Sequence, residues 1–373
     1  MDVDARMNEL LALNCGSSSL KYAVFRADAA VLRGEIRGIG SGGVVDHGAA
    51  VSAVFGELSK AGISALRAVG HRLVHGGSSH AAPTQVDDAL LASLAEVVPF
   101  APLHLPAELR AIEAVRKQFG ALPQVVCFDT AFHRTLPEVA RRFALPSSLF
   151  DAGVRRYGFH GLSYEYVVES LGARVLGRAV LAHLGNGASM VATRDGRSLD
   201  TTMGFTPTAG LVMGTRSGDL DPGLLVYLLE HGGYDARSLD RLVNQEAGLL
   251  ALSGTTSDMA SLLARCASDA RAALAVDVFC YQARKSIGSL TAVLEGLDSL
   301  VFTGGIGEHA PMVRMKICRS LGHLGIVLDD ARNGASAPIV SAEDSACRVH
   351  VIGTDEERMI ARHTMRVLDA SPR

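Results

Sequence analysis

The sequence predicts an α/β protein with two domains built from one duplicated unit. At about 150 residues per domain, 373 residues fit two domains better than one, and 48% of them are hydrophobic. Strand-like and helix-like segments alternate along the chain. A strand, a turn of small residues and a second strand occur around residues 14–21 (NCGSSSLK) and again around residues 183–190 (HLGNGASM). The two copies lie about half a chain apart, which indicates a diverged repeat.

Local patterns predict the individual elements. Apolar, strand-compatible runs predict strands over residues 10–15, 20–25, 68–77, 124–129, 178–184, 188–193 and 301–303. Helical periodicity predicts helices over residues 51–61, 87–97, 105–119, 271–297 and 355–369, with Pro106 in a first turn. Residues 304–308 are expected to form a glycine-rich turn before a further helix. Thr354 and Glu357 fit a capping box, which would leave Glu356 free to bind a metal ion.

The composition excludes several classes of function. Thirty-six Lys and Arg oppose 39 Asp and Glu, so no basic excess favours nucleic acid as a partner. Trp is absent, which argues against a base-stacking surface. No apolar run approaches the ~20 residues of a membrane span, so no membrane partner is expected. The acidic N-terminus lacks a signal core and the six cysteines form no C-x-x-C pair, so we expect reduced thiols in a cytoplasmic protein.

Three turns of small residues are candidate phosphate sites. The turn at residues 14–21 offers backbone N–H groups, hydroxyls and the positive charge of Lys21, and residues 183–187 repeat this design. Residues 304–308 follow a strand and open a helix, which permits close backbone approach to a nucleotide. Each turn by itself is equally explained as an ordinary hairpin or loop.

Polar residues in glycine-flanked segments suggest an anion pocket. Arg72, His160 and Arg216 have side chains that suit anionic groups, although surface loops would explain each of them alone. Asp129 ends a buried-type strand, where α/β sheets place functional groups. The alternative for Asp129 is a cap for the turn at residues 130–131.

Together these segments resemble the acetate kinase (acetokinase) family over nearly the whole chain. The segments that carry the resemblance occur in the family's order: residues 14–21, 70–77, 101–106, 128–133, 157–161, 183–187, 203–207, 213–222 and 302–308. The resemblance implies the duplicated RNase H-like fold of the sugar kinase, Hsp70 and actin superfamily, with the active site in the interdomain cleft. It implies an N-terminal domain of residues 1–135 plus a returning helix at 358–373, and a nucleotide-binding domain of residues 136–357.

The resemblance also implies a role for each matching residue. Asp129, His160 and Arg216 would be catalytic, and Asn14 and Glu356 would hold the metal ion. Acetate would be bound by Arg72 and by an apolar pocket made of Val74, Leu103, Phe159 and Pro207. ATP would contact Lys21, His183, Leu184, Gly185, Asn186, Gly187, Asp258, Met259, Ala260, Gly305, Ile306, Gly307, Glu308 and His309.

The implied activity is reversible, Mg²⁺-dependent transfer of the γ-phosphoryl group of ATP to acetate, giving acetyl phosphate and ADP by direct in-line transfer, with Mn²⁺ as a possible substitute metal. The implied assembly is a homodimer. Propionate or butyrate kinases with the same machinery, and a non-catalytic ATP-binding module of the same superfamily, remain alternatives. The chain departs from the family in having Ala260 where an arginine contacts the nucleotide, and His309 where the family has asparagine.

Overall fold

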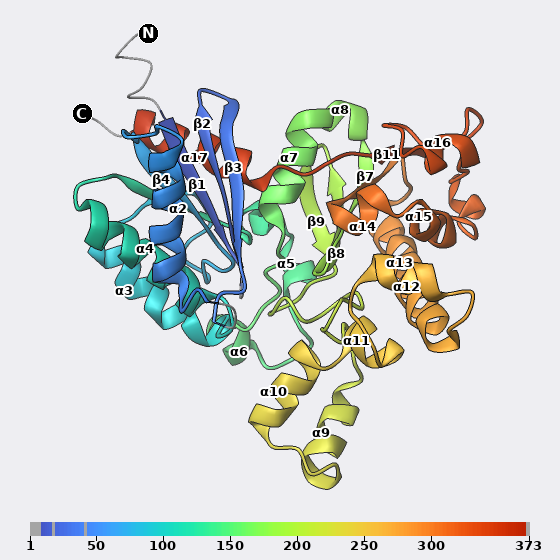
Figure 1. The fold of residues 1–373 in the computed structure, drawn as a ribbon. Helices are drawn as coiled ribbons and strands as arrows, with labels where there is room; N and C mark the ends of the chain where they lie inside the picture. The colour runs from blue at the N-terminus through green and yellow to red at the C-terminus, as the bar shows by residue number, and fades with distance from the viewer. Residues whose placement is uncertain (1–8, 17–18, 41–42, 371–373) are drawn as a thin grey trace. The chain divides into compact units, whose positions relative to one another are not determined.

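The computed structural model describes residues 9–16, 19–40 and 43–370, and the chain forms two compact units (Figure 1). Unit 1 contains the chain up to Arg134, Gly161–Tyr166 and the segment from Asp355 onward. Unit 2 contains Thr135–His160 and Val167–Thr354. Ser17 and Ser18 of the first small-residue turn lie outside the described residues.

Unit 1 is built on a six-stranded mixed sheet. Its strands are β1 (Glu9–Cys15), β2 (Ser19–Arg26), β3 (Ala29–Arg37), β4 (Ala68–Leu73), β5 (Thr84–Gln85) and β6 (Gln124–Phe128). Its main helices are α2 (His47–Lys60), α3 (Asp88–Val97), α4 (Leu105–Phe119) and α17 (Glu356–Ala370), with 3-10 turns at Val98–Phe100 and Ala131–Thr135. Helix α7 (Gly161–Leu171) contributes its first residues to unit 1 and the rest to unit 2.

Unit 2 is built on a five-stranded mixed sheet. The strands are β7 (Arg178–Leu184), β8 (Ala188–Arg194), β9 (Arg197–Thr201), β10 (Ser299–Thr303) and β11 (Arg348–Val351). The helices are α5 (Glu138–Arg141), α6 (Ser147–Asp151), α8 (Ala173–Leu176), α9 (Pro222–His231), α10 (Ala236–Gln245), α11 (Gly248–Ser253), α12 (Met259–Arg265), α13 (Ala270–Leu294), α14 (Gly304–His309), α15 (Pro311–Cys318) and α16 (Asp330–Gly334), with a 3-10 turn at Gly322–Leu324.

The two sheets share one topology, which confirms the predicted duplicated α/β architecture. The sheet of unit 1 has the order β3-β2-β1-β4-β6-β5, and the sheet of unit 2 has the order β9-β8-β7-β10-β11. In each, the first three strands form an antiparallel meander, and two later strands are parallel to the first: β4 and β6 in unit 1, β10 and β11 in unit 2. Unit 1 has β5 as an additional edge strand, antiparallel to β6. The strand–turn–strand repeat read from the sequence is the opening hairpin of each meander.

Both faces of the sheet of unit 1 are covered, because β1 is buried throughout and carries an unbroken apolar run over residues 10–13. Leu11 and Leu13 join one core with residues of α2 and α4, whereas Leu10 and Ala12 join another core with residues of α17. Side chains alternate between the faces of a strand, so a continuous apolar run requires cover on both sides. The C-terminal helix supplies the second cover.

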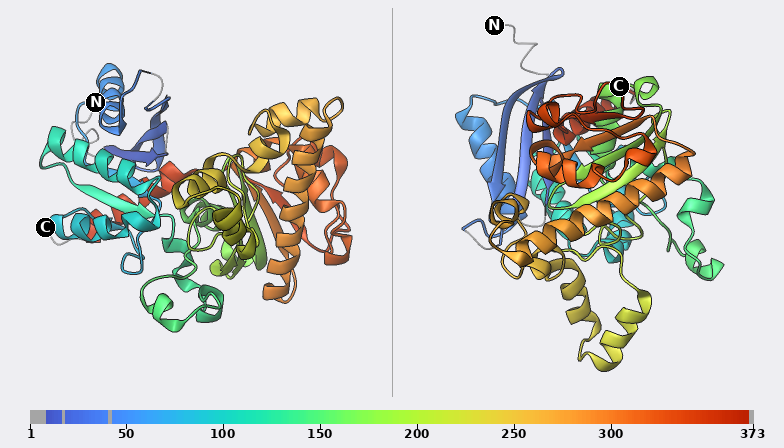
Figure 2. Two further views of the ribbon diagram at one scale, coloured as in Figure 1. Left: turned by 90° about the horizontal axis from the view of Figure 1, so that it is seen from below. Right: turned by 90° about the vertical axis from the view of Figure 1, so that its right-hand side faces the viewer.

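Helix α13 spans the sheet of unit 2 and packs against β7, β8 and β9 (Figure 2). Its N-cap, Asp269, accepts hydrogen bonds from the backbone of Arg271 and Ala272. Its buried face carries residues at helical spacing, including Val276, Phe279, Ala283, Ile287, Leu290 and Leu294. The predicted helix over residues 271–297 is confirmed with an end three residues earlier.

Two local predictions are wrong. The glycine-rich segment after β10 is the short helix α14 rather than a turn. Helix α17 is capped by Asp355, whose Oδ1 accepts from the backbone of Arg358, so Thr354 and Glu357 do not form a capping box. Glu357 bonds Asn14 instead, a contact 343 residues away along the chain that no local pattern contains.

Candidate active site

In unit 1 the predicted polar residues lie where neighbouring parallel strands end. Asn14 of β1 pairs in register with Arg72 of β4, and Arg72 pairs with Cys127 of β6. Asp129 follows directly after β6. Because the carboxyl ends of parallel strands meet at one edge of the sheet, three residues distant in sequence become neighbours.

Arg72 and Asp129 form a buried ion pair. The Nε of Arg72 donates to both carboxylate oxygens of Asp129 at 3.0 Å, and Nη2 donates to Oδ2 at 2.5 Å. The side chain of Asp129 is fully buried and that of Arg72 is 14% exposed. Burial by itself lowers the pKa of Arg72, but the charges of Asp129 and Glu356 outweigh it and raise the pKa. Asp129 therefore orients a permanently charged guanidinium and does not cap the following turn.

Asn14 connects this ion pair to the first turn of α17. Its Oδ1 accepts from Nη1 of Arg72 at 3.1 Å, and its Nδ2 donates to Oε2 of Glu356 at 2.9 Å and to Oε1 of Glu357 at 3.0 Å. Burial raises the pKa of both glutamates, and for Glu357 the charge of Glu356 raises it further. The sequence interpretation missed Glu357 because it treated this residue as a helix cap.

The donor set around Asn14 suits a hard divalent cation. Glu356 and Glu357 bring two carboxyl groups beside Asn14, which itself brings an amide oxygen; such oxygen ligands are those that Mg²⁺ prefers. Within the described part of the chain, no group of three or more His, Cys, Asp or Glu residues is arranged to hold a metal by itself. Waters or phosphate oxygens would have to complete the coordination of a cation bound here.

Lys21, Val74 and Leu103 are the other predicted site residues of unit 1. Lys21 lies opposite Asn14 in the β1–β2 hairpin and is exposed, and its charge lowers the pKa of Glu356 in opposition to burial. Val74 is buried two residues beyond Arg72, whereas Leu103 is 36% exposed in the loop before α4.

Glu108 is a second residue that sequence reasoning missed. It lies on α4, is only 2% exposed, and its Oε2 accepts from the backbone N–H of Val74 at 3.0 Å. Its Oε1 is buried and has no hydrogen-bond partner among the described residues. Burial raises the pKa of Glu108 to about 8, so the carboxyl group is largely neutral at pH 7. A glutamate on the apolar face of an otherwise amphipathic helix was the available signal.

In unit 2 two histidines stack beside the second small-residue turn. The rings of His160 and His183 are nearly parallel, with centroids 4.3 Å apart, and Nδ1 of His160 lies 2.8 Å from Oγ of Ser189. His160 has a left-handed backbone (φ 59°), a conformation that costs energy in a non-glycine residue and is often found at functional sites. Phe159, which precedes it, is buried.

Arg216 reaches the same turn. A Cβ at Gly187 would lie 3.3 Å from Nε2 of His160 and 3.6 Å from Nη1 of Arg216. The backbone carbonyl of Pro207 accepts from Nη1 of Arg216 at 3.3 Å. The turn at residues 184–187 is itself held by a hydrogen bond from Gly214 N to the carbonyl of Asn186. Histidine and arginine side chains thus gather at one backbone turn, an arrangement suited to phosphate oxygens.

The segment Gly304–His309 lies beside that turn. Thr303 of β10 pairs with His183 of β7, and a Cβ on Gly304 (φ 76°) would lie 2.8 Å from the carbonyl oxygen of Leu184. Only glycine allows this approach. Glu308 accepts from the backbone of Thr354 at 3.4 Å, and the side chain of His309 is 80% exposed. Unit 2 therefore brings together residues 183–187, residues 304–309, His160 and Arg216.

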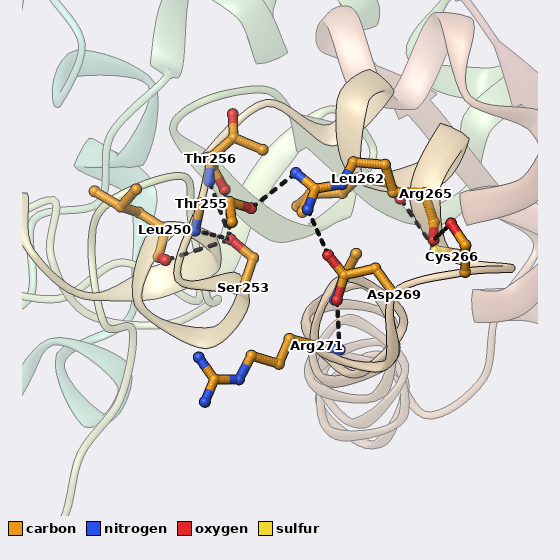
Figure 3. Close-up of polar contacts among 11 residues, drawn as sticks. Leu250, Ser253, Thr255, Thr256, Leu262, Arg265, Cys266, Asp269 and Arg271 are labelled. Carbon is orange, nitrogen blue, oxygen red and sulfur yellow. Dashed lines mark hydrogen bonds and ion pairs between the residues drawn. The ribbon is translucent and has the colours of Figure 1, made fainter.

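Asp258, Met259 and Ala260 lie at the start of α12. Asp258 is the N-cap of α12 and accepts from the backbone and hydroxyl of Ser261. In the described part of the chain, no hydrogen bond connects these three residues to the cluster above. Arg265 of α12 does not replace the arginine missing at position 260, since it donates to Thr255 and Asp269 (Figure 3).

None of the described helices is long and apolar enough to cross a membrane.

Comparisons of the whole chain with known proteins point to one family. The profile of the Acetokinase family matches residues 30–362. An acetate kinase of Rhodopseudomonas palustris is 45% identical over 96% of this chain and 98% of the relative. The crystal structure of Porphyromonas gingivalis acetate kinase superposes with a TM-score of 0.88 at 37% identity, and that of a propionate kinase from Francisella tularensis with 0.92 at 34% identity. Both alignments cover 97% of this chain and all of the solved chain. By sequence and by fold, over nearly its whole length, the chain belongs to the acetokinase family.

Proposed function

We propose that the protein is an acetate kinase, which transfers the γ-phosphoryl group of ATP reversibly to acetate and forms acetyl phosphate and ADP. The observation that carries the proposal is the Arg72–Asp129 pair, because an oriented, buried guanidinium is suited to binding a small carboxylate. Family membership over nearly the whole chain, with acetate kinases among the relatives, supports the same substrate.

In this proposal unit 1 binds the acyl substrate and the metal. Arg72 binds the acetate carboxylate through guanidinium N–H groups, and Asp129 is a positioning residue that holds Arg72. The acyl methyl would contact Val74 and Leu103, with Phe159 and Pro207 contributed by unit 2. Asn14 and Glu356 would hold Mg²⁺, or Mn²⁺ in its place, with Glu357 beside them. When bound, the divalent cation offsets negative charge on the ATP phosphates.

The residues of unit 2 would bind ATP and stabilise the transferring group. The nucleotide would contact residues 183–187, residues 305–309 and residues 258–260, the last of which also begin α12. Lys21 of unit 1 would add positive charge near the phosphates. Acetate is ionised at neutral pH, so the nucleophile needs no general base. The barrier lies in bringing two anions together and spreading charge over the phosphoryl oxygens, which is the task of Arg216 and His160.

Propionate kinase is the second candidate. The observation behind it is the similarity to the crystal structure of a propionate kinase, which is 34% identical to this chain and covered over its whole length. One extra methylene changes binding in an apolar pocket by only about 1–3 kcal/mol. Values of kcat/KM for acetate, propionate and butyrate would decide between the two substrates.

We also propose that the protein acts as a homodimer in the cytoplasm. Helices α9 and α10 extend away from the rest of unit 2 (Figures 1 and 2), and no residue of α9 is buried although most of them are apolar. Val226 and Tyr227 are 52% and 57% exposed, and exposed apolar surface of this kind marks interfaces. All six cysteines are free, as expected in a reducing compartment. Light scattering of a Val226→Lys variant, with Val139→Lys of α5 as control, would test the dimer: only the first should become monomeric.

The activity itself is tested by trapping acyl phosphate with hydroxylamine after incubation with acetate and Mg-ATP. We expect hydroxamate with acetate and Mg-ATP, and none after chelation of the metal or without acetate. ATP binding without acyl phosphate from any C2–C4 acid would instead support a non-catalytic nucleotide-binding protein.

A further inference from the structure

Arg314 is the largest fully buried side chain among the described residues. It lies on α15, immediately after the Gly304–His309 segment, and the phosphoryl-transfer proposal does not use it. Burying a charged group in a protein interior is costly unless the group is well compensated. The burial of this charged side chain therefore needs a physical explanation.

Neutral oxygen atoms surround the guanidinium of Arg314. Nη1 donates to the backbone carbonyls of Gly307 at 2.7 Å and Glu308 at 2.9 Å. Nε donates to Oδ1 of Asn333 at 2.8 Å, and Nη2 donates to the carbonyl of Asn333 at 2.8 Å and to Oγ of Ser336 at 3.0 Å. These contacts satisfy all five N–H groups that a guanidinium carries.

The acceptors on one side belong to the end of α14. A helix of six residues is too short to be stable by itself, and its last carbonyls have no partners within the helix. Arg314 supplies partners for two of those carbonyls. On the other side it is held by Asn333 of α16, which is also buried and donates to the carbonyl of Pro311.

The charge of Arg314 has no carboxylate within ion-pair distance in the described part of the chain, since every hydrogen-bond partner is neutral. Lysine could not make five bonds in this planar geometry, and an uncharged residue would leave the carbonyls without donors. The site therefore combines a rigid clamp with a net positive charge directly behind the Gly304–His309 segment.

We propose that Arg314 is the positioning residue for nucleotide binding: it holds the Gly304–His309 segment in its binding conformation, couples that segment to α16, and adds a buried positive charge that favours an anionic nucleotide. This inference rests on the proposed function, which assigns residues 305–309 to ATP. Acetate is bound by other residues in that proposal, so loss of the clamp should affect the nucleotide and leave the acetate subsite unchanged.

The test compares Arg314→Met and Arg314→Lys with Arg284→Met in the full-length protein. Arg284 is the matched control, because it donates to the backbone carbonyls of Ile317 and Lys316 at the far end of α15 rather than to α14. Calorimetry measures the Kd of Mg-ADP, steady-state kinetics gives KM for ATP and for acetate, and thermal melting is recorded with and without Mg-ADP.

We expect Arg314→Met to raise the Kd of Mg-ADP and the KM of ATP at least tenfold, with the KM of acetate changed less than twofold. Arg314→Lys should recover part of the affinity by restoring charge. Arg284→Met should lower the melting temperature but leave the Kd of Mg-ADP unchanged. If Arg314→Met does not fold, Asn333→Ala removes one side of the clamp and should raise the Kd about threefold or more.

The inference would be overturned if folded Arg314→Met bound Mg-ADP with the wild-type Kd, and the proposed function would stay intact. The same holds for Asn333→Ala where that variant is used. Equal losses for Arg284→Met and Arg314→Met would also overturn it, because they would indicate general destabilisation. Failure of the wild-type protein to bind Mg-ADP would overturn the proposed function, and the inference with it.

Discussion

Replacing Glu108 with glutamine should remove a pH-dependent loss of stability. Burial holds the pKa of Glu108 at about 8 in the folded protein, against an ordinary value of 4.5 for a glutamate carboxyl group. Between these two values the folded state binds the proton more tightly than the unfolded state, so stability falls as the pH rises from 4.5 to 8 and is constant outside that window.

The size of the effect follows from the two pKa values. Linkage gives a cost of about 1 kcal/mol at pH 5 and about 3 kcal/mol at pH 7, so this group alone should lower stability by about 2 kcal/mol over that range. Buried His71, whose Nε2 lies 2.7 Å from Oε1 of Gln124, opposes it. Burial lowers the pKa of His71 from 6.5 to about 4, so its contribution to stability is complete above pH 6.5 and is lost as the pH falls towards 4.

Because His71 is present in both proteins, the difference between wild type and Glu108→Gln isolates Glu108. Urea unfolding at pH 5, 6, 7 and 8 measures the free energy of unfolding of each. The glutamine amide faces the place where Oε1 has no partner, which costs about 1–3 kcal/mol at every pH. The free energy of unfolding of the variant, relative to that of the wild type, should therefore rise by about 2 kcal/mol between pH 5 and pH 7. Parallel curves for the two proteins would refute the reasoning.

Three further predictions concern activity. Arg216→Ala should lower kcat by roughly 10³ or more without unfolding the protein. The control is Arg241→Ala, at an exposed arginine paired with Glu246, which should leave kcat unchanged. Near-normal turnover of Arg216→Ala would remove Arg216 from the mechanism. Asp129→Asn keeps the shape of the side chain but removes the charge that orients Arg72. Steady-state kinetics should show a KM for acetate raised about tenfold or more, because a charge-assisted hydrogen bond worth about 1.5–3 kcal/mol is lost. An unchanged KM for acetate would contradict a positioning role for Asp129. Ala260→Arg restores the family's arginine and should lower the KM for ATP several-fold; no change would show that this segment lies away from the nucleotide.

The sequence predicted the elements whose determinants are local. The apolar run of β1, the helical spacing of apolar residues in α4 and the small-residue hairpins are each visible in a short stretch of sequence, because side-chain periodicity reflects the burial of each element. Helix α14 was missed because its glycines disfavour a helix, and its end depends on donors from Arg314. The cap of α17 was misassigned by one residue, since Thr354 and Asp355 both suit an N-cap.

By itself the sequence determined that this is a duplicated α/β chain, and motif order pointed to its family. It could not show that Glu357 shares the amide of Asn14, that Asp129 bonds Arg72 three times, or that Arg314 is enclosed by carbonyls. The bonded residues are far apart along the chain: Arg72 and Asp129 are separated by 57 positions, and Asn14 and Glu357 by 343. Strand register and the return of α17 create such contacts, and the charge state of a buried carboxyl group depends on the neighbours that folding places around it.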